Sequence, residues 1–80
     1  MERMWTGDAH VKYPKQWVVM VNMNYNKETH RHIGDVYTVV PTFEEAFFIE
    51  KKLGDSMGES TVFEGYDDTP QIGGLEIWSQ

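Results

Sequence analysis

The sequence predicts a single small α+β domain, an antiparallel sheet with one helix across a face, in the order β-β-α-β-β. Residues 16–26 alternate with the period of a strand, and the apolar side chains of residues 43–53 recur with the period of a helix. The chain has 80 residues, of which 40% are hydrophobic and 25% charged, as expected for one folded domain spanning residues 1–80.

The first two predicted strands form a hairpin. One face of residues 16–26 carries Trp17, Val19, Val21, Met23 and Tyr25. The polar segment 27–31 has the length of a hairpin connection, and residues 32–40 are rich in β-branched side chains. The alternation in this second strand breaks around Gly34 and Asp35, so we expect a β-bulge there.

A capped amphipathic helix is expected after Pro41. Thr42 and Glu45 have the spacing of a capping box, and Gly54 or Gly58 is suited to end the helix. The apolar arc of the helical wheel contains Phe43, Ala46, Ile49, Leu53 and Met57, with Phe47 at its edge. We expect Ala46 and Leu53 to lie in the core with Trp17. Phe48 points to the opposite, charged side and is predicted to be exposed.

Residues 61–66 are predicted to form a third strand and Leu75–Trp78 a short fourth one, joined by a loop rich in turn residues. Residues 1–15 are an uncertain lead-in, either a short strand or a segment packed over the sheet. The apolar runs are too short to span a bilayer, and the N-terminus has no apolar stretch of signal-peptide length. These features lead us to expect a cytoplasmic protein.

One face of the predicted sheet has no helix to cover it. This face includes Val18 and Met20. The chain also has eleven aromatic residues, more than one sheet–helix layer can bury. We therefore expect an exposed apolar surface that contacts a partner or another copy of the chain, unless the N-terminal segment covers it.

The charge is concentrated in the second half of the chain. Residues 1–40 carry five basic and four acidic side chains, whereas residues 41–80 carry two basic and nine acidic ones, giving a net charge of −6. An acidic chain repels a phosphate backbone, so direct binding to nucleic acid is not expected. The charge suits a protein partner with a basic surface, and it also favours solubility.

The residues available for catalysis or metal binding form no recognisable motif. There is no cysteine. His30 and His32 are two apart on a strand, so their imidazoles could chelate one ion, but a third ligand such as His10 is not specified by the spacing. Asp67 and Asp68 lack the pattern of a calcium loop. We expect no metal, no cofactor and no enzymatic activity.

A strand hairpin, the segment Pro41-Thr42-x-Glu44-Glu45-Ala46 and an amphipathic helix, in an acidic cysteine-free chain of this size, resemble small phage-encoded inhibitors. These include anti-CRISPR and host-takeover proteins. The resemblance implies a protein that acts in the host cytoplasm and binds a host enzyme or defence complex. It carries over no functional residue.

We therefore expect a non-enzymatic protein-binding module that blocks a larger macromolecular complex. The residues expected to contact the partner are Phe48, Glu44, Asp55, Val18, Met20, Asp67 and Asp68. One alternative is an assembly protein that forms a homodimer through the sheet face or a sheet edge. Another is a small metal-binding domain or enzyme that uses His30 and His32.

Overall fold

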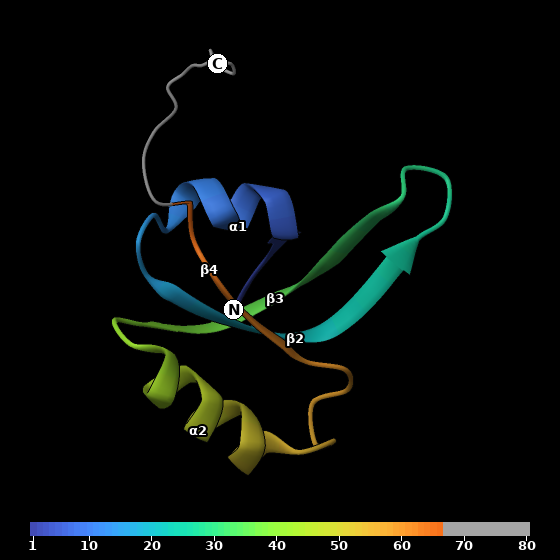
Figure 1. Cartoon of the computed structure of the whole chain (residues 1–80). Helices are drawn as coiled ribbons and strands as arrows, with labels where there is room; N and C mark the ends of the chain where they lie inside the picture. Colours follow the sequence, from blue (N-terminus) through green and yellow to red (C-terminus); the bar gives the residue numbers. More distant parts are fainter. Residues whose placement is uncertain (67–80) are drawn as a thin grey trace.

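The fold is a four-stranded antiparallel sheet with two helices (Figure 1). A computed structural model describes residues 1–66. Its elements are β1 (Glu2–Trp5), α1 (Thr6–Lys12), β2 (Trp17–Asn26), β3 (Arg31–Val40), α2 (Phe43–Leu53) and β4 (Thr61–Glu64). The strand order in the sheet is β1-β3-β2-β4.

The predicted α+β class is confirmed, but the predicted order is wrong at the N-terminus. Residues 1–15 contribute a strand and a helix, β1 and α1, before the hairpin. The strand predicted at Leu75–Trp78 lies outside the described residues.

The hairpin of β2 and β3 is the centre of the sheet. The two strands pair from Trp17 opposite Val40 to Asn26 opposite Arg31, as the alternation predicts. The expected irregularity occurs near Gly34, but the one extra residue there is on β2, where Asn22 has a positive φ of 52°. A side chain on Gly34 would collide with Met23, so only glycine fits opposite this bulge.

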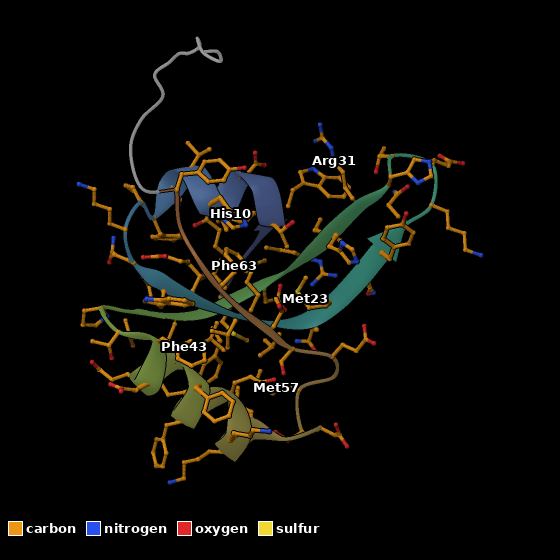
Figure 2. The ribbon with its side chains drawn as sticks, viewed as in Figure 1. His10, Met23, Arg31, Phe43, Met57 and Phe63 are labelled. Carbon is orange, nitrogen blue, oxygen red and sulfur yellow. The ribbon has the colours of Figure 1, made fainter. Side chains whose placement is uncertain are left out.

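The two helices lie on opposite sides of the sheet (Figure 1). On the α1 side, the buried cluster consists of Met4, Ala9, Val18, Met20 and Val36. In Figure 2, His10 and Phe63 lie on this side, whereas Phe43 and Met57 lie on the side of α2.

The expectation of a bare sheet face was wrong. Val18 and Met20 are fully buried, so they lie in the core and form no surface for a partner. The N-terminal segment covers this face: β1 brings Met4 to it, and α1 places Ala9 against it. The small Ala9 side chain lets the helix approach the strands closely, and it is itself fully buried.

On the other face, α2 packs against β2, β3 and β4. The Thr42 hydroxyl accepts a hydrogen bond from the Glu45 backbone N–H at 3.3 Å, which confirms the predicted start of the helix. The Thr42 hydroxyl also donates to the Glu45 carboxylate at 3.1 Å. The helix ends before Gly54, which has a positive φ of 55°.

A polar network ties three neighbouring strands together. Arg3 on β1 donates to Asp35 Oδ1 on β3 at 3.1 Å, and the Asn22 amide on β2 donates to Asp35 Oδ2 at 3.1 Å. These bonds, led by the one from Asn22, lower the pKa of Asp35 below its ordinary value. Nearby, Lys12 of α1 donates to Glu2 of β1 at 2.6 Å, and this hydrogen bond raises the pKa of Lys12.

The segment after β4 returns to α1. The Gly65 N–H donates to Gln16 O at 2.8 Å, and the Tyr66 N–H donates to His10 O at 2.9 Å. Gly65 is buried so closely against the backbone of Tyr13 that a side chain there would collide with it. Within residues 1–66, neither helix has the length and apolar character needed to cross a lipid bilayer.

Candidate protein-binding surface

The side of α2 that faces away from the sheet carries Phe48. This side chain is 61% exposed, as the helical wheel predicts. The Lys52 ammonium lies 5.2 Å from the centre of its ring, which is a cation–π contact at the surface. Met4 is buried on the opposite face of the sheet, so it does not cover Phe48.

Two further phenylalanines of α2 are exposed, and the sequence did not predict this. Phe43 is 47% and Phe47 is 44% exposed, and their rings stack with centres 5.6 Å apart. Phe43 also meets the edge of Trp17 at 5.0 Å. We call Phe43, Phe47 and Phe48 the α2 aromatic surface.

The cause of this exposure is the narrow contact between α2 and the sheet. Ala46 is the only fully buried residue of the helix, so the closest approach to the strands runs through a methyl group. The larger rings one position or one turn away stand beside this line of contact. Phenylalanines that flank a small residue on the apolar arc are the sequence signal that could have revealed them.

Charged residues surround the α2 aromatic surface. Glu44 and Glu45 occupy the first turn of the helix, and Lys51 and Lys52 occupy the last. This order matches the helix dipole, which favours acids at the N-terminus and bases at the C-terminus. Glu44 is exposed, and Asp55 is exposed in the turn that follows the helix. Asp67 and Asp68, also predicted to contact a partner, lie outside the described residues.

A shallow groove runs beside α2 over the outer part of β3. It has a volume of about 300 Å³ and is lined by Tyr37, Thr38, Ile49, Lys52 and Leu53. β1 pairs with β3 only as far as Val36, so the following residues of β3 have no neighbouring strand on that side within residues 1–66. This part of β3 is an open sheet edge.

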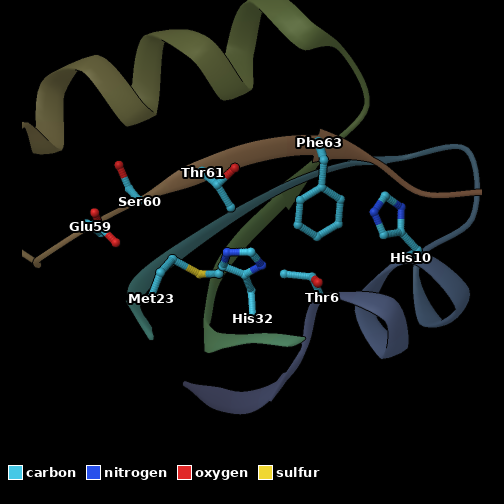
Figure 3. A pocket seen from close by; sticks show the side chains of 8 residues that line it. All are labelled: Thr6, His10, Met23, His32, Glu59, Ser60, Thr61 and Phe63. Atoms are coloured by element: carbon cyan, nitrogen blue, oxygen red, sulfur yellow. The ribbon is translucent and has the colours of Figure 1, made fainter. Parts of the chain in front are cut away.

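A second hollow lies on the α1 side of the sheet (Figure 3). Its volume is about 450 Å³, and side chains from both helix α1 and strands β2, β3 and β4 face it. The residues that line it are Thr6, His10, Met23, His32, Glu59, Ser60, Thr61 and Phe63. We call it the α1 pocket. It exists because the seven-residue α1 covers only part of its sheet face.

His10 is held in one orientation at the wall of the α1 pocket. Its Nδ1 lies 2.9 Å from Glu64 O, and its ring is between Phe63 at 4.2 Å and Tyr66 at 4.8 Å. A carbonyl oxygen only accepts hydrogen bonds, so Nδ1 carries the proton and donates to it. In neutral His10 the other nitrogen, Nε2, is therefore an acceptor.

His30 and His32, which were considered as metal ligands, both lie against Tyr25. His30 Nδ1 lies 3.0 Å from the Tyr25 hydroxyl, and the His32 ring lies 4.8 Å from the Tyr25 ring. Both histidines line a pocket of about 320 Å³ beside Arg31, whereas His10 shares only the α1 pocket with His32. Over residues 1–66, no three His, Asp or Glu side chains are grouped so that they could hold a metal ion.

Comparison with known proteins gives no relative for this chain. No protein-family model matches it, and neither the curated proteins nor the solved structures contain a significant match.

Proposed function

We propose that this protein is a non-enzymatic binding module that inhibits or modulates a larger macromolecular complex. The contact is made by the α2 aromatic surface, and the partner is a protein with a basic surface. A phage-encoded inhibitor is the kind of protein that the architecture resembles, and such a protein would act in the host cytoplasm.

The observation that carries this proposal is the exposure of three phenylalanines on one eleven-residue helix. Phe48 is the most exposed of them. Phe43 and Phe47 stack on each other, whereas Phe48 lies on the side of the helix that faces away from the sheet. Exposed apolar groups mark interaction sites, and aromatic anchors contribute a large share of the binding free energy at protein interfaces. A helix laid against a partner presents such anchors from a rigid element.

The charge of the chain supports a basic partner. The net charge is −6, and the acids of residues 41–80 outnumber the bases by seven. Glu44 and Asp55, at the two ends of α2, would meet basic side chains at the rim of the interface. Rim charges of this kind mainly set the association rate and its salt dependence, whereas the central aromatics set the lifetime of the complex.

The test is an affinity capture from the native host with the full chain, followed by identification of the bound protein by mass spectrometry. The identified partner is then purified, and its affinity is measured for the wild type, Phe48→Ala and Val11→Ala. Val11 is 65% exposed on α1, across the sheet from α2, so it is a matched control for loss of an exposed apolar side chain.

We expect Phe48→Ala to weaken the complex about thirtyfold, which corresponds to about 2 kcal/mol, and Val11→Ala to leave it unchanged. Equal affinity for the wild type and Phe48→Ala would exclude the α2 aromatic surface as the contact.

The open edge of β3 favours a second function, self-assembly. On the side away from β2, the residues of β3 after Val36 have no neighbouring strand within residues 1–66, and the groove of Tyr37 and Leu53 adjoins this edge. Two copies that paired edge to edge would continue the sheet and cover the groove. Sedimentation or light scattering over a range of concentrations tests this alternative, because a monomer at all concentrations excludes it.

A further inference from the structure

We propose that the α1 pocket binds the guanidinium group of an arginine side chain that a protein partner presents. The site is separate from the α2 aromatic surface, so the proposal does not rest on that surface. It is based on the hydrogen-bond acceptors, the aromatic wall and the charge of the pocket.

Residues that carry hydrogen-bond acceptors line the pocket. Glu59 lies on one side of it, and Thr6 lies on another (Figure 3). The fixed tautomer of His10 adds an acceptor at Nε2. Guanidinium is the side-chain group with the most donors, five N–H groups in one plane.

The walls of the pocket suit a flat cation. Phe63 and His10 lie with their rings 4.2 Å apart, and both line the space (Figure 3). A guanidinium plane stacks on an aromatic face and donates from its edge at the same time, which a lysine ammonium cannot do. A volume of about 450 Å³ leaves room for the side chain and for water around it.

The charge of the site points the same way. Glu59 is the only acidic residue that lines the pocket, and within residues 1–66 it forms no salt bridge. Arg31 lines the neighbouring pocket, where its guanidinium lies over the Trp5 ring at 5.7 Å. The α1 pocket itself is lined by one carboxylate and by no Lys or Arg.

The experiment is a titration of the isotope-labelled full chain with N-acetyl-arginine amide, followed through the backbone amide signals in NMR spectra. N-acetyl-citrulline amide is the matched probe, because it keeps the shape of arginine without its charge. N-acetyl-lysine amide keeps the charge without the plane. We expect saturable shifts at Thr6, His10 and Thr61 with millimolar affinity for arginine, and weaker binding of both other probes.

Glu59→Gln tests the acceptor. This residue is exposed, so the substitution should leave the fold intact, and we expect it to weaken arginine binding about tenfold. Glu44→Gln on α2 removes the same charge outside the pocket and should change nothing. His10→Asn keeps a donor for Glu64 O but removes the Nε2 acceptor and the ring, and should also weaken binding.

Three results would overturn the proposal. They are the absence of saturable shifts at the pocket, equal binding of the arginine and citrulline probes, and equal loss of affinity in Glu59→Gln and Glu44→Gln. None of them depends on the α2 aromatic surface, and Phe48→Ala should bind the arginine probe as the wild type does. Failure here is thus distinguishable from failure of the proposed function.

Discussion

The two faces of the sheet are covered to very different extents. The shorter helix, the seven-residue α1, encloses the larger buried cluster, because β1 adds Met4 from the sheet edge and Ala9 allows close contact. The longer helix, the eleven-residue α2, buries one residue completely and leaves three phenylalanines exposed. Helix length therefore does not decide how well a face is sealed. Both helices contact the sheet through a fully buried alanine, and the difference is that β1 adds Met4 beside α1.

The α1 side and the α2 side of the sheet therefore have different roles. The α1 side stabilises the domain through Val18 and Met20, which contact no solvent. Val19 and Val21 are also fully buried, but the α2 side retains apolar side chains of the helix at the surface. Substitutions on each face test whether the two sides differ in this way.

The largest loss of stability is expected for Met20→Ala. Met20 is the largest of the fully buried side chains, so its truncation removes buried apolar area and leaves a cavity. We expect the free energy of unfolding to fall by about 2–5 kcal/mol, measured by urea denaturation. Val11→Ala, on the exposed side of α1, serves as the control. A Met20→Ala protein as stable as this control would show that the α1 side is not the core.

A smaller loss is expected for Leu53→Ala on α2. The sequence predicted a core position, but Leu53 is only half-buried and lines the groove beside β3. We expect a loss of about 1–2 kcal/mol, because only part of the side chain leaves water on folding. If urea denaturation gave a larger loss for Leu53→Ala than for Met20→Ala, the ranking of the two faces would be reversed.

Asp35→Asn should change how stability depends on pH. The pKa of Asp35 is lowered in the folded state below its ordinary value of 3.8, so its ionised form stabilises the fold above that pH. This contribution is lost as the pH falls through the folded-state pKa. We expect wild type to be more stable than Asp35→Asn at neutral pH and the difference to shrink below about pH 4.

Thermal unfolding from pH 3 to 7 measures this difference. A gap between the two proteins that stays constant over the whole range would contradict the role of the Asp35 charge in joining Arg3 and Asn22. Asp8→Asn, in the first turn of α1, is the control for removal of an acid outside this network.

The smallest effect on stability is expected for Phe48→Ala. The ring is mostly exposed and contacts Lys52, so the free energy of unfolding should change by no more than about 0.5 kcal/mol. Urea denaturation of the free protein checks this. A loss as large as that of Leu53→Ala would mean that Phe48 has a structural role, and reduced partner binding by this variant would then no longer identify a contact.

The elements with long periodic patterns were predictable from the sequence. The alternation of residues 16–26 specified β2, and Thr42 with its apolar arc specified α2 almost to the residue. Both signals are local, since each depends only on the spacing of neighbouring side chains. The exposure of Phe48 followed from the same helical wheel.

The N-terminal elements were not predictable in this way. β1 has four residues and α1 has seven, so each contains only about two repeats of its period, too few to identify the element. Ala9 is buried because of what α1 packs against, a tertiary effect that its sequence neighbours do not reveal. Val18 and Met20 were wrongly expected to be exposed for the same reason, because the N-terminal segment covers their face of the sheet. The α1 pocket was missed for the same reason, since its lining residues come from distant parts of the chain.

The place of β1 at the edge of the sheet has a consequence for the order of folding. The β2–β3 hairpin closes a short loop, whereas Glu2 must find Val36, which lies more than thirty positions along the chain. Short loops cost less chain entropy to close, so local pairs tend to form before distant ones. During synthesis, β1 and α1 also leave the ribosome before their partner strand exists. The N-terminal segment that seals the core is thus made before its partner strand and docks after the hairpin has formed.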